Sequence, residues 1–401
     1  MITLDDIRAA ADRIQKDILA TPLISSPALS RMFGAEIHLK MESLQKTGSF
    51  KARGAMNLIK ASCGRIPKGG VVAASAGNHA QGVALAARQV GIPATIVMPV
   101  GASISKQEAT RSYGGKVLLE GQTVSESLAV AEKLARDGRT FIHPFDDPLI
   151  MAGQGTVALE IVEALPDVER VIIPVGGGGV IAGMAVALRA LRPGVKITGV
   201  QAAVCPSAVV AIQKGEIVEI QGATSIADGI AVRKTGAAPF EIIRDLVDNV
   251  VTVEEEHIAA AILLLMERKK IVAEGAGAVA LAALMSRAVP LQPGEKTVLL
   301  ISGGNLDSPL LGRIIRKGLI QSGRILRVNV MLADEPGVLA RLLNCIAARQ
   351  ANVLHIHHNR SRRDFPVNMT AVELELETRG ESHVEEIERS LRDAGYTLSV
   401  C

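Results

Sequence analysis

Four consecutive glycines, Gly176 to Gly179, separate an apolar, β-branched run at residues 171–175 from an apolar, Ala-rich run at residues 180–191. The first run predicts a strand and the second a helix. Glycine loses more backbone entropy on folding than any other residue and adds no packing, so four in a row indicate that something approaches the backbone closely. A phosphate held by consecutive N–H groups at a helix N-terminus fits this position, and a tight turn for close packing is the alternative.

This loop differs from two common phosphate-binding motifs. It has no GK[ST] sequence as a P-loop has, and it lacks the GxGxxG spacing with an acidic residue about twenty positions later that dinucleotides favour. A nicotinamide-dependent oxidoreductase, which an α/β core would otherwise allow, is therefore disfavoured.

Two other predicted strands, at residues 71–75 and 297–302, also end in glycine-bearing loops. Predicted strands alternate with Ala-rich helical segments from about residue 70 onward, which indicates an α/β fold with parallel sheets covered on both faces. Open sheets of this class bind ligands beyond the carboxyl ends of their strands. The three glycine-bearing loops therefore predict the position of the site.

The pattern changes near residue 324, where segments alternate in the order strand, helix, strand, strand, helix, strand. This βαββαβ order is the ferredoxin-like α+β plan. It predicts a separate domain at residues 324–401, joined to a first part at residues 1–318 by a short linker at residues 319–323.

Composition excludes several classes of partner. The net charge of +3 is spread along the 401 residues, and only eight are aromatic (6 Phe, 2 Tyr, no Trp), so nucleic-acid binding is disfavoured. The four cysteines, at positions 63, 205, 345 and 401, form no close pair and indicate reduced thiols. The first residues lack the apolar core of a signal peptide, and the longest uncharged run is interrupted by the four glycines. We expect a cytoplasmic protein with no membrane span.

Lys51 lies in the segment TGSFKARGA, where Ser49 is the expected N-cap and Lys51 falls in the first turn of a helix. The positive end of a helix dipole disfavours an ammonium group, so the pKa of Lys51 is expected to fall. A neutral amine is what Schiff-base chemistry requires. On position alone, a solvated surface lysine is the alternative.

The segment SAGNHAQG forms a predicted strand-to-helix turn at residues 75–82. Backbone N–H groups at Ser75, Ala76 and Gly77 are expected to bind a carboxylate, and Asn78 to donate to a phenolate or hydroxyl oxygen. His79 is either a site residue or a helix-cap residue, and ordinary turn chemistry is the alternative for the whole segment.

Together with SGGN at residues 302–305, these motifs resemble in order and spacing the fold-type-II (tryptophan synthase β-like) pyridoxal-phosphate enzymes, specifically the threonine/serine dehydratase group. The resemblance covers the whole chain and implies a two-lobed catalytic part, with a small lobe at about residues 45–145. It implies a Schiff base to Lys51 beside Phe50, a phosphate cradle at Gly176, Gly177, Gly178 and Gly179, and a substrate-carboxylate and cofactor-oxygen loop at Ser75 to Asn78. Ser302 is implied as the partner of the pyridine nitrogen, which a hydroxyl cannot hold protonated.

The activity implied is β-elimination from L-threonine to 2-oxobutanoate and ammonia, and from L-serine to pyruvate. Serine racemase, threonine synthase and β-replacing sulfhydrylases are alternatives within the same cofactor class, and a non-catalytic amino-acid sensor is an alternative outside it. Related racemases and dehydratases hold a divalent cation with acidic residues after the strand that follows the glycine loop. Residues 199–208 here, GVQAAVCPSA, contain no carboxylate, so we expect no metal of that kind.

The C-terminal segment resembles an ACT domain, a small amino-acid-sensing fold, through ADEPGVLARL at residues 333–342. The resemblance implies a branched-chain amino acid as effector and a homodimer or homotetramer. A single ACT domain resembles the dehydratases often labelled catabolic more than the biosynthetic ones, which commonly carry two.

Overall fold

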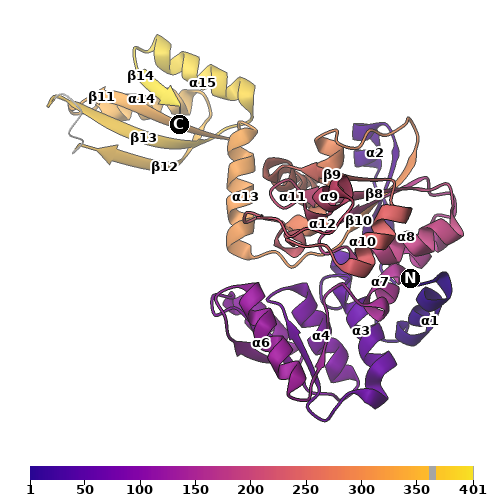
Figure 1. Cartoon of the computed structure of the whole chain (residues 1–401). Coiled ribbons are helices and arrows are strands. Elements are labelled where there is room, and N and C mark those ends of the chain that lie inside the picture. The colour runs from indigo at the N-terminus through magenta and orange to yellow at the C-terminus, as the bar shows by residue number, and fades with distance from the viewer. Residues whose placement is uncertain (361–366, 401) are drawn as a thin grey trace. The chain divides into compact units, whose positions relative to one another are not determined.

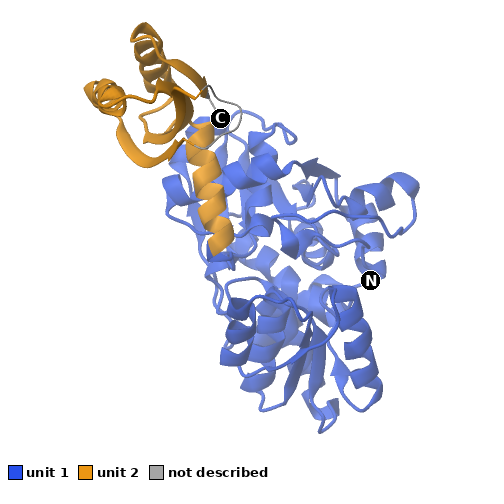
Figure 2. Ribbon diagram, turned by 90° about the vertical axis from the view of Figure 1, so that its left-hand side faces the viewer, with its two compact units in different colours: residues 1–308 blue, residues 309–401 orange. Residues whose placement is uncertain are grey.

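The computed structural model describes residues 1–360 and 367–400, so that Cys401 lies outside the described residues. The chain divides into two compact units, Met1–Ser308 and Pro309–Cys401 (Figure 2). Each unit has its own hydrophobic core. Cys63, Cys205 and Cys345 are free thiols. No helix in the described part of the chain is both long and apolar enough to cross a membrane.

The first unit contains a large and a small lobe, each built on a twisted sheet (Figure 1). The sheet of the large lobe has the strand order β1-β2-β10-β7-β8-β9 and is parallel except for the edge strand β1. Its strands are β1 (Leu23–Ser25), β2 (Glu36–Met41), β7 (Arg170–Pro174), β8 (Lys196–Ala202), β9 (Asn249–Val253) and β10 (Lys296–Ile301).

Helices cover this sheet, and its apolar core lies mainly between the strands and two of them, α7 and α8. The helices of the large lobe are α1 (Leu4–Ile14), α2 (Pro27–Phe33), α7 (Pro148–Ala164), α8 (Gly179–Leu191), α9 (Ser207–Lys214), α10 (Ala237–Leu246), α11 (Glu255–Lys269) and α12 (Gly275–Met285), with short 3₁₀ turns η1 (Glu42–Leu44) and η3 (Asp228–Ile230).

The small lobe has a parallel four-stranded sheet in the order β5-β4-β3-β6. Its strands are β3 (Val71–Ala74), β4 (Ala94–Met98), β5 (Lys116–Leu119) and β6 (Thr140–Phe141), and its helices are α3 (Lys51–Ser62), α4 (Asn78–Gln89), α5 (Ile104–Ser112) and α6 (Val124–Arg136), with the 3₁₀ turn η2 (Cys63–Arg65). The predicted α/β class with parallel sheets is confirmed, and β3, β7 and β10 end at the three glycine-bearing loops, as predicted from the sequence.

The second unit contains an antiparallel sheet in the order β12-β13-β11-β14, whose inner face packs on two helices. Its elements are β11 (Ile325–Ala333), α14 (Val338–Ala348), β12 (Asn352–Asn359), β13 (Met369–Glu377), α15 (Glu381–Asp393) and β14 (Thr397–Val400). The predicted ferredoxin-like order is confirmed. Buried and half-buried residues alternate along most of β11, as expected of a strand with one face on a core. This alternation is why the strand could be predicted from the sequence.

The boundary between the units differs from the predicted one. Residues 319–323 were expected to be a linker, but α13 (Ser308–Gln321) continues through most of them, and the units divide at Ser308. Apolar residues recur at helical spacing in SPLLGRIIRKGLIQ, and Ile314 is buried. Amphipathic helix formation therefore extends across the segment that was expected to be a connection.

A buried ion cluster fixes the helix that carries Lys51. The guanidinium of Arg53, in the first turn of α3, is fully buried and contacts Glu42 at 2.7 and 2.8 Å and Glu160 at 2.6 and 2.9 Å. Lys40 contacts Glu160 at 2.5 Å, and Thr21 donates to Glu42. The cluster joins α3 to β2, η1 and α7 in a single arrangement.

Replacing Arg53 with Met is expected to lower the free energy of unfolding by about 3–5 kcal/mol, because the carboxylate of Glu42 is left buried without its main counter-charge. Urea unfolding at pH 7 measures the change. Arg8→Met, which removes an exposed pair with Asp5, is the control and is expected to change stability little. A loss below about 1 kcal/mol in Arg53→Met would contradict this account of the cluster.

Candidate active site

Lys51 is the first residue of α3, and its Nζ donates a hydrogen bond to the carbonyl oxygen of Pro144 at 2.9 Å. Nζ also lies 5.3 Å from the centre of the Phe50 ring. Burial lowers the pKa of the Lys51 ammonium to about 8, against the opposing attraction of Glu274. The predicted direction of this shift is confirmed, but burial is its main cause. An amine with this pKa is available near neutrality as a nucleophile and a base.

The expected N-cap of this helix was wrong. Phe50 occupies the cap position and makes no side-chain cap, while the hydroxyl of Ser49 is buried without a partner among the described residues. The backbone of Ser49 instead pairs with Gly303, and the N–H of Phe50 donates to the carbonyl oxygen of Ser302 at 3.1 Å. Pairing with the SGGN loop therefore replaces side-chain capping and places Lys51 next to that loop.

The side chain of Ser302 is buried, and its hydroxyl donates to the carbonyl oxygen of Ala276 at 3.2 Å. A hydroxyl has one proton to donate. In this structure that proton is used by the carbonyl oxygen of Ala276.

Asn78, the first residue of α4, is held by two residues from the large lobe. Its Nδ2 donates to Oε1 of Glu274 at 2.6 Å, and its Oδ1 accepts from Nδ2 of Asn305 at 2.6 Å. The same Nδ2 of Asn305 donates to the carbonyl oxygen of Thr47 at 2.8 Å. Sequence reasoning assigned no role to Glu274 or to Asn305, although Asn305 is the last residue of the SGGN motif.

Glu274 is buried, and burial raises the pKa of its carboxyl to about 7. The charge of Asp228 raises this pKa further, whereas the hydrogen bond from Asn78 and the charge of Lys106 lower it. Lys106, on α5 of the small lobe, pairs with Asp228 at 2.8 Å. The site thus contains a lysine and a carboxyl that both titrate near neutrality, a pattern that is common at functional sites.

The loop between β3 and α4 leaves its backbone partly exposed at Ser75, Ala76 and Gly77. The hydroxyl of Ser75 accepts from the N–H of Gly77 at 3.1 Å, which closes a tight turn. His79 is buried, and its Nε2 bonds to the carbonyl oxygen of Ile142 at 2.9 Å. Burial lowers the pKa of His79 to about 3, so this ring is neutral at physiological pH and is tied to the backbone just after β6.

The glycine loop runs from the end of β7 into α8. Gly177, Gly178 and Gly179 are buried, and Gly178 has a φ of +97°, a left-handed conformation that side chains disfavour. A Cβ on Gly177 would lie 2.4 Å from the ring of Phe145. Close packing, the alternative raised from the sequence, therefore explains part of the glycine content.

The residues around this loop also fit a phosphate. Within residues 1–360 and 367–400, no backbone group accepts the N–H groups of Gly176 to Gly179, which lie at a helix N-terminus. A buried hydroxyl beside the loop, that of Thr235, also has no partner in the described structure and could donate to an anion. Anion binding at this loop would satisfy backbone donors that are otherwise buried and unpaired.

Residues 199–208, where the resemblance led us to look for a divalent-cation site, contain a helix cap. Gln201, at the end of β8, accepts from the N–H groups of Ala208 and Val209 at 2.9 and 3.1 Å, in the first turn of α9. The expectation that this segment holds no cation stays a prediction.

A family model described as "Pyridoxal-phosphate dependent enzyme" matches residues 14–303, which include Lys51, the glycine loop and Ser302. The chain belongs to this family. A second model, described as "ACT domain", matches residues 326–392 in the second unit. The cofactor is therefore pyridoxal phosphate, and the second unit is an ACT domain.

The chain is similar over its whole length to two bacterial enzymes. It is 49% identical over 401 residues to the L-threonine ammonia-lyase of Thermotoga maritima, covering 100% of both chains. It is 48% identical to the L-threonine ammonia-lyase of Geobacter sulfurreducens, covering 98% of both.

Solved structures resemble the first unit. A T.th. threonine deaminase matches with a TM-score of 0.72 and 40% identity, over 76% of this chain and 99% of that one. Maize serine racemase matches with a TM-score of 0.75 and 34% identity, over 80% of this chain and 98% of that one. Both similarities agree with the predicted fold-type-II architecture.

Replacing Lys51 with Met is expected to stabilise the protein without cofactor at pH 7 by about 3 kcal/mol, because burial of the ammonium lowers its pKa from 10.5 to about 8. The folded chain holds its proton less tightly than the unfolded chain, so the penalty is complete below pH 8 and disappears as the pH rises toward 10.5. Urea unfolding from pH 7 to 10.5 measures this gap. Lys68→Met, at an exposed lysine, is the control, and a gap independent of pH would contradict the shift.

Proposed function

We propose that the protein converts L-threonine to 2-oxobutanoate and ammonia, and L-serine to pyruvate and ammonia. The observation that carries this proposal is the buried Lys51, whose pKa is lowered to about 8. Segment 143–147 links it to the glycine loop through Pro144 and Phe145. The full-length similarity to L-threonine ammonia-lyases favours threonine as a substrate.

Pyridoxal phosphate, when bound, supplies an aldehyde that takes the substrate amine and a ring that makes the α-proton removable. Lys51 is the residue that we assign to hold the cofactor, with Phe50 packed beside it. With the substrate amine on the cofactor, the free amine of Lys51 would be the base that takes the proton from Cα. The N–H groups of Gly176 to Gly179 would hold the phosphate.

The substrate carboxylate is assigned to the loop from Ser75 to Asn78, at the N-terminal end of α4, where the helix dipole favours an anion. The N–H of Ser75 donates to the carbonyl oxygen of Val97 at 3.1 Å and that of Gly77 to the hydroxyl of Ser75, so the N–H of Ala76 is the donor that we assign.

Asn78 would donate to the cofactor's ring oxygen from a position fixed by Glu274 and Asn305. His79 has a backbone partner at Nε2, so it is assigned a supporting role under this loop.

Ser302 is assigned to the pyridine nitrogen. A serine hydroxyl has a pKa far above neutrality and donates without transferring its proton, so it leaves that nitrogen neutral. In β-elimination the electron pair left by the Cα proton would form a Cα–Cβ double bond as the Cβ–O bond breaks and the hydroxyl takes up a proton to leave as water. Elimination would therefore need less electron withdrawal by the ring than racemisation, in which Cα keeps that electron pair.

Replacing Lys51 with Ala is expected to abolish the absorbance near 410 nm of the covalently held cofactor and to reduce turnover by at least about a thousandfold. Absorbance spectra and production of 2-oxo acid from threonine measure the two effects. The Lys68→Met variant is the control. Turnover near wild type in Lys51→Ala would refute the assignment.

The same assay separates the rival activities. Serine racemase activity, which the similarity to the maize enzyme keeps open as an alternative, would give D-serine from L-serine. A β-replacing enzyme would consume sulfide in place of water. The proposed activity gives 2-oxo acid with and without sulfide.

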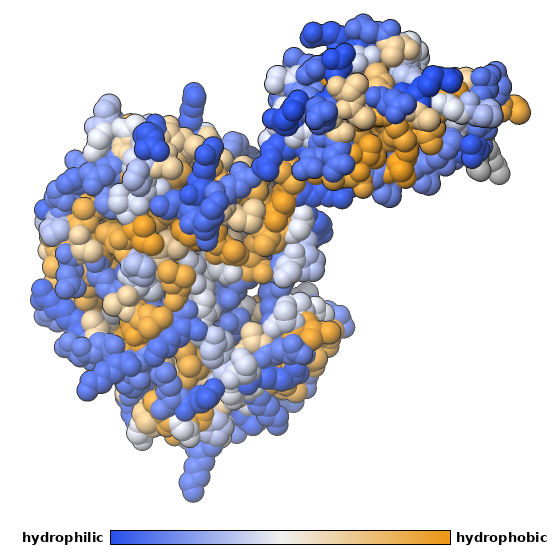
Figure 3. All heavy atoms as spheres, turned by 180° about the vertical axis from the view of Figure 1, so that it is seen from behind, coloured by the Kyte–Doolittle hydropathy of each residue, from blue (hydrophilic) through white to orange (hydrophobic). Residues whose placement is uncertain are grey.

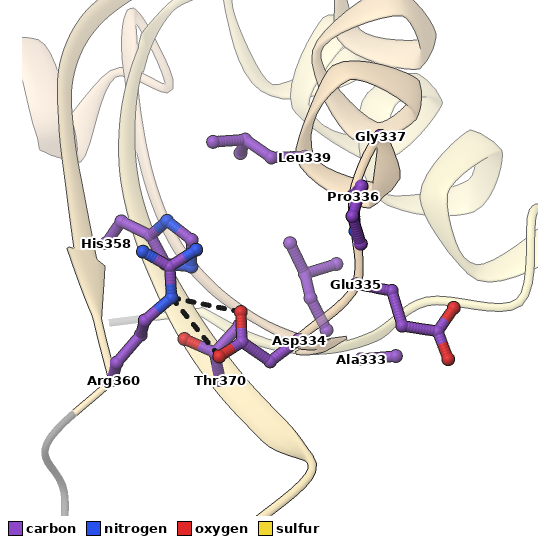
Figure 4. Close-up of a pocket in the computed structure, with 10 residues that line it drawn as sticks. Ala333, Asp334, Glu335, Pro336, Gly337, Leu339, His358, Arg360 and Thr370 are labelled. Carbon is purple, nitrogen blue, oxygen red and sulfur yellow. Dashed lines mark hydrogen bonds and ion pairs between the residues drawn. The ribbon is translucent and has the colours of Figure 1, made fainter.

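We also propose that the ACT domain binds a branched-chain amino acid. A cavity of about 420 Å³ lies between the loop before α14 and the end of β12 (Figure 4). Arg360 pairs with Asp334 at 2.9 Å there, and His358 lies on β12 beside them. The arginine suits a carboxylate, the aspartate suits an amine, and Leu332 and Leu339 suit an aliphatic side chain.

Valine or isoleucine is expected to change the rate at subsaturating threonine, and Arg360→Gln is expected to raise the concentration for half effect by at least about tenfold, because a charged partner of the carboxylate is lost. Initial rates against effector concentration measure this. Arg392→Gln, an exposed arginine on α15, is the control. An unchanged response in Arg360→Gln would place the effector elsewhere.

The ACT domain also presents a surface suited to a second copy of the chain. β12 is an edge strand of its sheet, and Leu354 and Ile356 on it are 47% and 39% exposed. Figure 3 shows apolar residues gathered on this unit. We propose that such surfaces support a homodimer or homotetramer, because exposed apolar edge strands favour pairing.

A further inference from the structure

The segment His143–Asp147 leads from β6 of the small lobe to α7 of the large lobe and contacts two parts of the site. The carbonyl oxygen of Pro144 accepts from Nζ of Lys51 at 2.9 Å. The ring of Phe145 packs so closely on Gly177 that a Cβ there would lie 2.4 Å away. One short segment therefore sets the position of the lysine relative to the glycine loop.

The carboxyl end of this segment is fixed by two helix caps. The carboxylate of Asp147 accepts from the first N–H groups of α7 at 2.7 and 3.2 Å. The carboxylate of Asp146 accepts from the first N–H groups of α10 at 2.8 and 3.0 Å. The side chains of Pro239 and Ile243 on α10 in turn pack against Gly178. The segment thus caps two helices and is tied to the glycine loop through one of them.

The remaining residue, His143, shapes the turn between these contacts. Its Nδ1 accepts from the N–H of Asp146 at 2.8 Å and from the N–H of Phe145 at 3.2 Å. The ring packs edge to face between Phe141 and Phe145, with centroid separations of 6.0 and 4.7 Å. An acceptor at Nδ1 must be unprotonated, so this arrangement requires the neutral ring with its proton on Nε2.

We propose that His143 is a positioning residue. Its neutral ring holds segment 143–147 in the shape that aligns Lys51 with the phosphate cradle at Gly176 to Gly179. Protonation of the ring loosens the segment, so that Lys51 and the cradle are no longer aligned. A protonated Nδ1 faces two N–H donors and repels them. The turn then loses two hydrogen bonds, and Pro144 and Phe145 lose their support. This inference rests on the proposed roles of Lys51 and Gly176 to Gly179.

The surroundings of His143 favour the neutral ring. Burial lowers the pKa of His143 below its ordinary value, opposed by the negative charge of Asp146. The charged and titratable groups that face it are Asp146 and Asp147 of the segment, Lys51 of α3, Glu132 of α6 and His79 of α4. Of these, Lys51 also lowers the pKa of His143, and His79 is neutral above about pH 3. Because the pKa of His143 is lowered, the ring is neutral and the turn is intact at pH 6.5 and above, and the turn is lost only as the pH falls further, through the lowered pKa.

Two substitutions distinguish the role of His143 as a hydrogen-bond acceptor from its role in aromatic packing. His143→Asn keeps a side-chain carbonyl that accepts two N–H groups in an Asx-type turn and does not titrate. His143→Phe keeps the aromatic packing but has no acceptor. The dissociation constant of pyridoxal phosphate, from absorbance titration of protein stripped of cofactor, is measured for wild type and both variants from about pH 8 to about pH 4.5, because the pKa of His143 lies below its ordinary value.

At pH 8, His143→Asn is expected to bind the cofactor within about threefold of wild type, and His143→Phe at least about tenfold more weakly, because two N–H groups lose their acceptor. Between about pH 8 and about pH 4.5, wild type is expected to lose at least about threefold more affinity than His143→Asn. Protonation of the cofactor phosphate, with a pKa of about 6, affects both proteins and cancels in this comparison.

Equal pH dependence in wild type and His143→Asn would overturn the proposal, as would wild-type affinity in His143→Phe. If His143→Phe fails to fold, the pH comparison between wild type and His143→Asn still decides. Retention of the 410 nm band in Lys51→Ala would refute the proposed function instead, so the two failures are distinct.

Discussion

The guanidinium of Arg53 and the carboxylates of Glu42 and Glu160 form the interaction on which the arrangement of the site depends. Burying these charges costs desolvation energy, which the ion pairs and hydrogen bonds offset when all of them are made. A partial set leaves a buried charge without compensation, so intermediate positions of α3 are strongly disfavoured. Lys51, two residues earlier on the same helix, is consequently held at a fixed depth between the lobes. The side chain of Lys51 is flexible, but its position is well defined because its backbone has a single low-energy position.

The pKa shifts in the site have the same origin, which is the burial of its residues. Burial lowers the pKa of Lys51 to about 8 and raises that of Glu274 to about 7, so both groups are destabilised as ions. The fold tolerates this because the rest of the unit supplies a large apolar core from α7, α8 and the central strands. The folded state therefore loses stability at the residues whose reactivity depends on burial. Next to them, the neutral side-chain amides of Asn78 and Asn305 connect the start of α4 to the loop after β10.

Features set by neighbouring residues were predictable from the sequence, and features set by distant ones were not. The strands, the glycine-bearing loops and the ferredoxin-like order follow from local hydrophobic periodicity, and the structure confirms them. Ser49 was wrongly expected to cap α3, because its pairing with Gly303 joins distant parts of the chain, and no local pattern encodes it. Glu274 lies 196 positions from Asn78. A glutamate inside an apolar, small-residue segment was the available signal, since a buried carboxylate requires a partner.

The backbone pairing of Ser49 and Phe50 with Ser302 and Gly303 has a mechanical consequence. It joins the two lobes through buried residues beside Lys51, whereas the pair of Lys106 with Asp228 joins them through an aspartate side chain that is 63% exposed. Exposed ion pairs contribute about 1 kcal/mol or less, so the buried backbone pairing is the stronger of these two connections. The lobes are therefore joined most firmly on the side of the site that carries Lys51.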